Sequence, residues 1–460
     1  MPKAHKPPAK SGKKKHTPAP ASTPSQGRVV GKPAGAPIFS EPSVTADPTK
    51  YKVPHASDSQ AYGEMDDLIQ ASKFLPLSFP TVAGVAEPVF NLADAFGSTG
   101  PATVAKIQQA GRIIFHSAGD TGCTRGPKSE NAVVEKMLTD FDGESGGALP
   151  QFFYHLGDVV YSFGEHKYYY DQFYDAFRNY ARPVFAIAGN HDGVVLPPPA
   201  GSGNPNDSLN AFLANFCAPG FAHAPDAMGL SRTTMIQPGV YFTLEAPFVR
   251  ILGLYSNMLE NPGVISPTKD PKNGDPKFEN IPTAQLDYLS AALERVKKQN
   301  FKGALLICVH HPPYAFGTHS GSMVMLKEID SICNSAGVFP HALLSGHSHN
   351  YQRFTRHLGN RQIPFIVCGN GGHGLSKLSK TQTLRTPQSM AIFAQPEAKD
   401  SVTFESYDDA DYGYLRVLVD PAQLRIEYHP ASDGGETKTP DDSVTVDLAS
   451  GTLVHYNAPA

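Results

Sequence analysis

Polar side chains that can bind metal ions follow five apolar runs of this sequence. The clearest case follows residues 183–188, where Gly189 is succeeded by Asn190, His191 and Asp192. An apolar run of four to eight residues that ends at Gly is typical of a buried strand entering a turn. An amide, an imidazole and a carboxylate side by side are only a weak indication of function, because polar residues are common in loops.

The same pattern occurs four more times along the chain. The other strand-like runs occupy residues 112–118, 151–156, 304–309 and 342–345. The side chains of interest that follow these runs are Asp120, Asp158, Tyr161, His310, His347 and His349. Because strands of one sheet can bring their carboxyl ends to a common edge, we expect these side chains to meet the Asn190 turn there.

These donor types indicate the chemistry. Carboxylate, amide and imidazole groups suit divalent ions, whereas a phenolate such as that of Tyr161 favours a harder ion such as ferric iron. His347 and His349 can diverge toward two ions, and Asp158 can bridge them. Two ions about 3.5–4 Å apart bind a phosphate ester and lower the pKa of a bound water toward about 7, which gives a metal-bound hydroxide as nucleophile.

In their order and spacing, the five motifs resemble the metallophosphoesterase (calcineurin-like) superfamily and, within it, the purple acid phosphatases. The resemblance spans residues 111–372. The broad superfamily opens with Asp-x-His, but here Gly122 stands where that His belongs. Purple acid phosphatases supply the missing ligand with a Tyr three residues after the second Asp, and Tyr161 stands at that position after Asp158.

The resemblance implies two metal sites that share one carboxylate. The first site, for Fe(3+), would take its ligands from Asp120, Tyr161 and His349. The second site, for a divalent Fe, Zn or Mn ion, would take its ligands from Asn190, His310 and His347. Asp158 would bridge the two ions.

The resemblance also implies three residues that act on the substrate. His191 would contact the phosphate, and Asp192 would hold the His191 imidazole through its other ring nitrogen. His319, nine residues after His310, stands where the family places a substrate-contacting His. The chain departs from the family in having no Trp, and Thr121 and Pro313 stand where the family often has that residue.

Three further histidines are expected to have structural roles. His116 and His155 lie inside strand-like runs, so we expect them to be buried and hydrogen-bonded in the core. His311 follows a proposed ligand directly and should point away from it.

Strand-like and helix-like segments alternate from residue 111 onward. Helices are predicted at residues 131–140, 168–180, 283–299 and 325–336, and paired strands at 239–245 with 249–255 and at 412–419 with 423–429. These patterns and the resemblance predict an α+β fold, an α/β/β/α four-layer sandwich of two packed mixed β-sheets flanked by helices. The long insertion at residues 193–235 follows a site motif and is expected to form the rim of the pocket.

The 460 residues divide into three predicted parts. Residues 1–60 are rich in Pro, Lys, Ala and Ser, and we expect a disordered basic tail there. Residues 61–110 form a lead-in segment, and residues 111–450 form the predicted catalytic domain. Residues 1–40 hold seven Lys and one Arg but no acidic residue, so with a chain charge of −4 the remainder carries −12.

The expected partner is a small phosphorylated substrate. Basic residues are concentrated in the tail, so the sequence does not predict a nucleic-acid partner. No apolar run approaches the roughly 18 residues of a membrane span, and no signal peptide is recognised, so a cytoplasmic location is the default and export by another route is the alternative. The five Cys are odd in number and show no metal-type spacing.

The sequence leaves three functions open. The leading hypothesis is an acid phosphatase-like hydrolase that cleaves phosphate monoesters. A phosphodiesterase acting on nucleotides or lipid headgroups would use the same core. A non-catalytic metal-binding scaffold is the third hypothesis, but it would be expected to lack ligands or His191.

Overall fold

The computed structural model describes eleven stretches of the chain. These are residues 35–42, 59–70, 79–80, 82, 84–143, 148–195, 208–267, 281–378, 388–389, 400–433 and 439–458. The disordered tail predicted over residues 1–60 therefore lies outside the described residues, except for residues 35–42 and 59–60.

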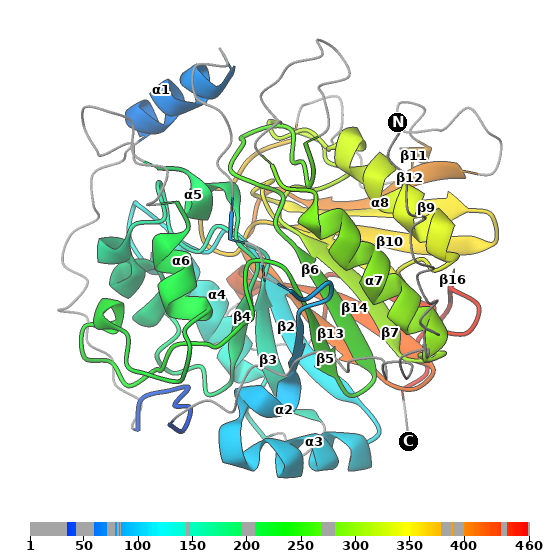
Figure 1. Ribbon diagram of the computed structural model, residues 1–460, viewed down its shortest axis with the longest axis horizontal. Helices are drawn as coiled ribbons and strands as arrows, with labels where there is room; N and C mark the ends of the chain where they lie inside the picture. The colour runs from blue at the N-terminus through cyan, green and yellow to red at the C-terminus, as the bar shows by residue number, and fades with distance from the viewer. Residues whose placement is uncertain are drawn as a thin grey trace, which may run out of the picture.

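The larger of two mixed sheets has nine strands (Figure 1). They are β1 (Val89–Asn91), β5 (Phe242–Ala246), β6 (Val249–Leu254), β7 (Ala304–Val309), β8 (Ala342–Ser345), β9 (Tyr351–Leu358), β10 (Arg361–Cys368), β11 (Gln388–Ser389) and β12 (Asp400–Asp408). Their order across the sheet is β1-β5-β6-β7-β8-β10-β9-β12-β11. β6, β7, β8 and β10 are parallel, whereas β5 and β9 run antiparallel to their neighbours β6 and β10.

The second sheet has seven strands. They are β2 (Ile113–Ala118), β3 (Pro150–His155), β4 (Val184–Ala186), β13 (Gly413–Val419), β14 (Gln423–Pro430), β15 (Asp442–Asp447) and β16 (Thr452–Leu453). Their order is β16-β15-β14-β13-β2-β3-β4, in which β2, β3 and β4 are parallel. Every residue of these three strands is buried, as expected for parallel strands covered on both faces.

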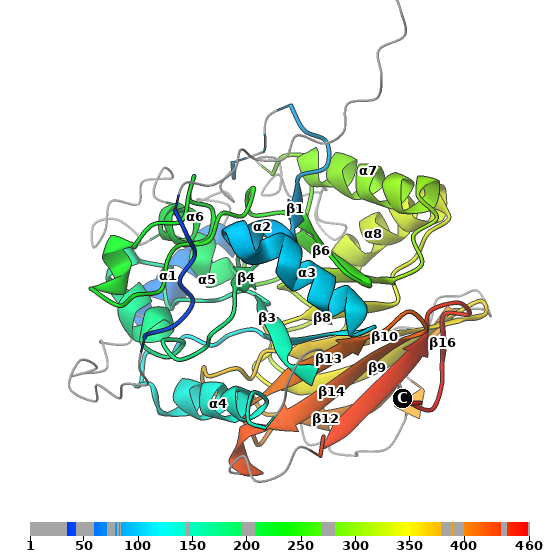
Figure 2. The ribbon, with the colours of Figure 1, turned by 90° about the horizontal axis from the view of Figure 1, so that it is seen from below.

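Helices flank the two sheets. They are α1 (Ser59–Gln70), α2 (Leu92–Ala95), α3 (Gly100–Gln109), α4 (Lys128–Thr139), α5 (Asn190–Gly193), α6 (Asn210–Phe216), α7 (Ala284–Lys298) and α8 (Met323–Ala336). Figure 2 shows α7 and α8 together on one side of the sandwich and α4 on the opposite side. The predicted arrangement of two mixed sheets between helices is therefore confirmed. Among the described residues, no helix combines the length and apolar character that crossing a bilayer requires.

One predicted helix takes another form. In place of an α-helix over residues 168–180, the structure has a 3₁₀ turn at His166–Tyr168 followed by a π-helix at Tyr170–Tyr174. Four neighbouring aromatic residues, Tyr169, Tyr170, Phe173 and Tyr174, are all buried here. Aromatic side chains lose freedom against the preceding turn of an α-helix, and tertiary packing decides the backbone geometry in this segment.

The lead-in segment contributes to the larger sheet. β1 pairs in parallel with β5, and α2 follows β1 directly. In α1, the side chain of Met65 is fully buried in the core. The described parts of residues 61–110 are thus packed against the strands that follow.

A buried polar network joins the second sheet to α4. His116 on β2 contacts the Tyr180 hydroxyl at 3.0 Å through Nδ1 and the Asp140 carboxylate at 2.9 Å through Nε2. The Tyr414 hydroxyl on β13 donates to the same Asp140 oxygen at 2.7 Å. Burial lowers the pKa of His116, in agreement with the predicted role of this residue as a hydrogen-bonded core histidine.

We expect Asp140→Ala to destabilise the protein because it leaves two buried donors, on His116 and Tyr414, without an acceptor. Each such donor costs about 1–3 kcal/mol, so the apparent free energy of unfolding should fall by at least about 2 kcal/mol in urea denaturation. The exposed Glu294→Ala on α7 is the control and should change it by less than about 0.5 kcal/mol. Equal stability of the two variants would contradict a structural role for this network.

Candidate metal centre

The predicted ligands come from the carboxyl ends of strands in both sheets. Asp120, Asp158 and Asn190 follow β2, β3 and β4 of the seven-stranded sheet. His310 and His347 follow β7 and β8 of the nine-stranded sheet. The expectation of one edge of a single sheet is therefore wrong in detail, because the two packed sheets present their strand ends to the same place.

Four donor atoms form a first cluster around Tyr161. Its hydroxyl oxygen lies 3.0 Å from Asp120 Oδ1, 3.1 Å from Asp158 Oδ2 and 3.3 Å from His349 Nε2. His349 Nε2 lies 3.3 Å from Asp120 Oδ1. The structure therefore brings together the residues predicted for the first metal.

A second cluster forms around the Asn190 side chain. Its Oδ1 lies 3.0 Å from His310 Nε2 and 3.1 Å from His347 Nδ1. His310 Nε2 also lies 3.2 Å from Asp158 Oδ2, the oxygen that faces Tyr161. Asp158, His310 and His347 offer ligand atoms that all lie within 4.8 Å of one another. One carboxylate oxygen of Asp158 is thus shared by both clusters.

Backbone carbonyls orient the histidines of these clusters. His310 Nδ1 contacts the Leu156 carbonyl at 2.8 Å, and His349 Nδ1 contacts the Gly374 carbonyl at 3.0 Å. A hydrogen bond at one ring nitrogen fixes the tautomer and leaves the other nitrogen free to bind metal. Asp120 Oδ2 accepts the backbone N–H of His347 at 2.8 Å.

The donor set fits a metal ion. Asp120, Asp158 and Tyr161 are at most 1% exposed, and buried charges must be paired or bind a metal. Burial and the carboxylates of Asp120 and Asp158 raise the pKa of Tyr161 well above its ordinary value. Burial also lowers the pKa of His310, but the charge of Asp158 outweighs it and raises that pKa to about 9. A cation would favour ionised Tyr161 and unprotonated His310, the forms that bind metal.

Three predicted ligands have strained backbones. Asp120, Asp158 and His347 have φ values of 58°, 56° and 66°, in the left-handed region that non-glycine residues rarely adopt. Strain of this kind clusters at functional sites, where the surrounding structure holds it in place.

The structure shows why position 122 has no room for a metal-binding side chain. A Cβ at Gly122 would lie 2.5 Å from the Val159 carbonyl oxygen and would also collide with Gln172 Oε1. The Gln172 amide accepts the backbone N–H of Tyr161 at 3.0 Å and donates to the Tyr161 carbonyl at 2.9 Å. The space that a side chain would need is filled by the residue that clamps Tyr161.

The predicted contact between Asp192 and His191 is wrong. His191 Nδ1 contacts the Ser162 carbonyl at 2.8 Å instead. Asp192 accepts backbone N–H groups of Asp158 at 2.9 Å, Val159 at 3.1 Å and Gly189 at 2.8 Å. Its carboxylate satisfies donors of the loop that carries Asp158 and Tyr161, so it organises that loop rather than the imidazole.

His319 lies beside the second cluster, as predicted, and has an unforeseen neighbour. Its ring centroid is 4.5 Å from that of His347, and its Nδ1 is 3.2 Å from Glu260 Oε1. Glu260, His319 and His347 also form a group whose ligand atoms lie within 4.8 Å of one another. Glu260 follows β6, a strand that ends beside β7 at the same edge of the sheet. This position after a strand end is the signal by which the sequence could have marked Glu260 as a site residue.

Two more residues at the site were missed. Tyr62 on α1 stacks on the His191 ring at a centroid distance of 4.2 Å, and nothing in its local sequence marks it. His373 stacks on Tyr161 at 3.7 Å and contacts the Gly122 carbonyl through Nδ1 at 2.9 Å.

The remaining histidines behave as expected. His155 contacts the Thr121 hydroxyl at 2.9 Å and is fully buried. Both ring nitrogens of His311 bond outside the two clusters, with Nδ1 at 2.7 Å from Ser256 Oγ and Nε2 at 2.6 Å from the Leu259 carbonyl. Its ring packs beside that of His347, at a centroid distance of 4.2 Å.

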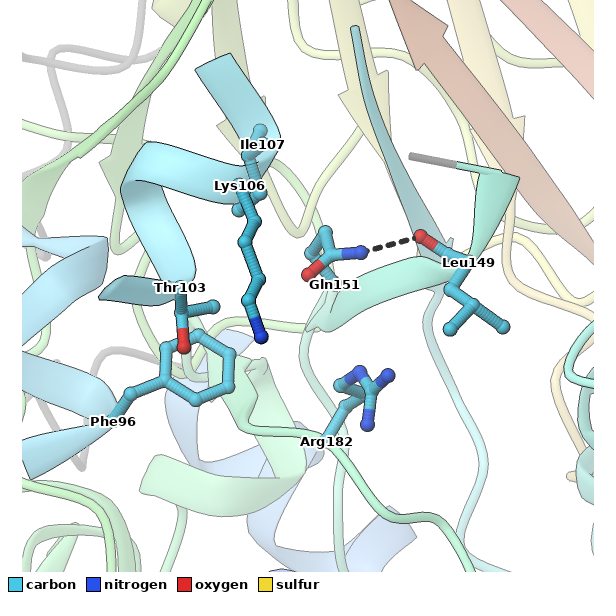
Figure 3. Close-up of a pocket in the computed structure, with 7 residues that line it drawn as sticks. All are labelled: Phe96, Thr103, Lys106, Ile107, Leu149, Gln151 and Arg182. Atoms are coloured by element: carbon cyan, nitrogen blue, oxygen red, sulfur yellow. Dashed lines mark hydrogen bonds between the residues drawn. The ribbon is translucent and has the colours of Figure 1, made fainter. Parts of the chain in front are cut away.

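A separate cavity of about 330 Å³ has another lining (Figure 3). It is lined by Phe96, Thr103, Lys106, Ile107, Leu149, Gln151 and Arg182. None of the predicted site residues is among them. The Arg182 guanidinium donates hydrogen bonds to the carbonyls of Pro150 and Ala181.

Comparison with known families identifies the class of protein. The sequence model of the calcineurin-like phosphoesterase family matches residues 119–351, which include the first and last motifs. The chain belongs to this family, and the predicted membership is confirmed. A comparison with curated protein sequences finds no match.

Several solved structures are similar to this chain. GAP50, the anchor in the inner membrane complex of Plasmodium, is 12% identical, with a TM-score of 0.44, and the match covers 73% of this chain and 89% of that one. PhoD is 13% identical, with a TM-score of 0.43 and coverage of 75% and 72%. A dimetal phosphatase from Danio rerio is 11% identical, with a TM-score of 0.41 and coverage of 73% and 99%.

We expect Asp192→Asn to weaken metal binding by about 10–100-fold, because an amide in place of the carboxylate turns a donor toward the backbone N–H groups of the ligand loop. Metal content after dialysis against a range of free-metal concentrations measures this. Unchanged metal binding with a lower kcat would instead indicate that Asp192 acts on catalysis by holding the His191 imidazole.

Proposed function

We propose that this phosphoesterase is a dinuclear enzyme of the purple acid phosphatase kind that hydrolyses phosphate monoesters. The observation that carries the proposal is the position of Asp158 Oδ2, 3.1 Å from the Tyr161 hydroxyl and 3.2 Å from His310 Nε2. A single buried oxygen between two donor clusters is the arrangement that two neighbouring ions require.

Tyr161 supports ferric iron at the first site, and the Asn190 cluster supports a divalent Fe, Zn or Mn ion at the second. When bound, the two ions supply Lewis-acid polarisation of the phosphoryl group and a nucleophile from water at neutral pH. The protein contributes the ligand geometry, the dry surroundings and the residues that contact the substrate.

His191 is the proposed phosphate-contacting residue. Its Nδ1 donates to the Ser162 carbonyl at 2.8 Å, which leaves Nε2 for the substrate. The Tyr62 ring stacked on it holds the imidazole plane. His191 thus has a fixed tautomer and a fixed orientation, as charge stabilisation or proton donation at a phosphoryl group requires.

His319 is the second proposed substrate contact. Glu260 Oε1 lies 3.2 Å from its Nδ1, and a carboxylate in this position orients an imidazole. Burial raises the pKa of Glu260, but His319 and His191 lower it more, to about 2, so Glu260 carries its charge at neutral and mildly acidic pH.

A phosphodiesterase would use the same residues in a site that admits a second ester group. Initial rates on an aryl phosphate monoester and on the matching diester separate the two. We expect at least a tenfold higher kcat/KM for the monoester, and the reverse preference would favour the diesterase. A scaffold is disfavoured because every predicted ligand and His191 are present.

We expect Tyr161→Phe to abolish the visible phenolate-to-iron charge-transfer band of the iron-loaded protein. The substitution removes the oxygen and keeps the ring, so stacking on His373 and the fold should remain. Absorption spectra with far-ultraviolet circular dichroism measure both. A colourless, fully active wild type with two divalent ions would remove the purple acid phosphatase assignment and leave the phosphoesterase standing.

We expect Asp158→Ala and His191→Ala to fail in different ways. Loss of the shared oxygen should remove metal from both sites together with activity. The His191 variant should keep both metals and lose about 10²–10⁴-fold in kcat. Metal analysis beside steady-state kinetics checks both, and loss of metal from the His191 variant would mean that this residue is a ligand.

A further inference from the structure

The Asn190 side chain has two chemically different ends, and each faces a different environment. Its Oδ1 lies among the nitrogens of His310 and His347, as a metal ligand must. Its Nδ2 donates to the Tyr62 hydroxyl oxygen at 2.7 Å and to Glu260 Oε2 at 3.3 Å. Asn190 is fully buried, so water cannot replace either set of contacts.

The direction of each hydrogen bond in this network is determined. An ionised carboxylate only accepts hydrogen bonds, so Glu260 must face donors. The Tyr62 hydroxyl gives its single proton to Glu260 Oε2 at 2.6 Å, and its oxygen is then left to accept from Asn190. A reversed amide would place its oxygen against two acceptors and its NH₂ group toward the metal.

Neither residue belongs to the five motifs. Tyr62 lies on α1, 128 positions before Asn190, and Glu260 follows β6, 70 positions after it. The Tyr62 ring on α1 stacks at 4.2 Å on His191 of α5, the short helix that begins at Asn190, and Figure 2 draws the two helices in the same region. The buried Met65 anchors α1 in the core.

We propose that Tyr62 and Glu260 are positioning residues of the second metal site, which hold the Asn190 amide with its oxygen toward the ion. This inference rests on the proposed function, because it assigns Asn190 to the divalent ion. It makes α1 a part of the metal centre. Glu260 also contacts His319 through its other oxygen, so one carboxylate links the second metal site to a substrate-contacting residue.

The test is the affinity of the full-length protein for Zn²⁺ at the second site, with the first site loaded with iron. Tyr62→Phe removes one acceptor. Glu260→Gln keeps the shape of the side chain, but its NH₂ group can donate a hydrogen bond to the Tyr62 hydroxyl oxygen. The Tyr62 hydroxyl can then donate its proton to Asn190 Oδ1, which favours the reversed orientation of the Asn190 amide. We expect each variant to bind Zn²⁺ about 10–100-fold more weakly, the usual effect of losing a residue that orients a ligand. Iron content and the charge-transfer band should stay at the wild-type level, which also reports that the fold is intact.

Two controls separate orientation from general structural damage. Glu64→Gln makes the same chemical change on the exposed face of α1, where Glu64 accepts a hydrogen bond from Gln60 at 3.1 Å, and should bind Zn²⁺ like the wild type. Asn190→Asp has two equivalent oxygens and no orientation to hold, so adding Tyr62→Phe to it should not weaken Zn²⁺ binding further.

The outcomes are distinguishable. Wild-type Zn²⁺ affinity in both Tyr62→Phe and Glu260→Gln overturns the inference and leaves the proposed function intact. The same loss in the Asn190→Asp background, or parallel loss of iron, also overturns it. A wild-type protein that binds no second ion overturns the proposed function, and this inference with it.

Discussion

The structure of this phosphoesterase depends on one buried carboxylate oxygen, Asp158 Oδ2, which faces both donor clusters. Burying a charge is costly unless it is paired, hydrogen-bonded or bound to a metal. The protein meets this condition with rigid surroundings. Asp158 Oδ1 accepts the backbone N–H of His191 at 2.9 Å, and the Asp192 carboxylate accepts the backbone N–H groups of Asp158 and Gly189. The two sheets supply the rest of the donors because their strand ends meet at this oxygen.

The exchange of a His ligand for Tyr161 that we propose at the first site has a packing reason. Gly122 leaves the space that the Gln172 amide needs, and Gln172 holds the backbone of Tyr161. The rings of His373 and His191 both pack on the phenol ring of Tyr161. Gly122 and Tyr161 are thus two parts of one local arrangement, as the proposed exchange of ligands requires.

Much of the site could be predicted from sequence because its residues sit where local signals are strong. Each predicted ligand except Tyr161 stands within four positions of a buried strand, and Tyr161 follows Asp158 by three positions. The strand-like and helix-like segments, together with the family resemblance, also predicted the layers of the fold. The contacts that the sequence did not predict join residues that are far apart in the chain. Asp192 is adjacent to His191 in the chain, yet its carboxylate turns toward a loop 32–34 residues earlier. Tyr62 and Glu260 reach Asn190 only through folding, and residues 168–180 take their backbone form from the packing of buried aromatic rings.

Anomalous diffraction from crystals of the metal-loaded protein tests most directly whether Asp158 bridges two metal ions, as we propose. We expect two anomalous peaks about 3.5–4 Å apart, with the iron peak next to Tyr161, the other next to Asn190, and Asp158 Oδ2 in contact with both. A single peak, or two peaks of which only one contacts Asp158, would contradict it.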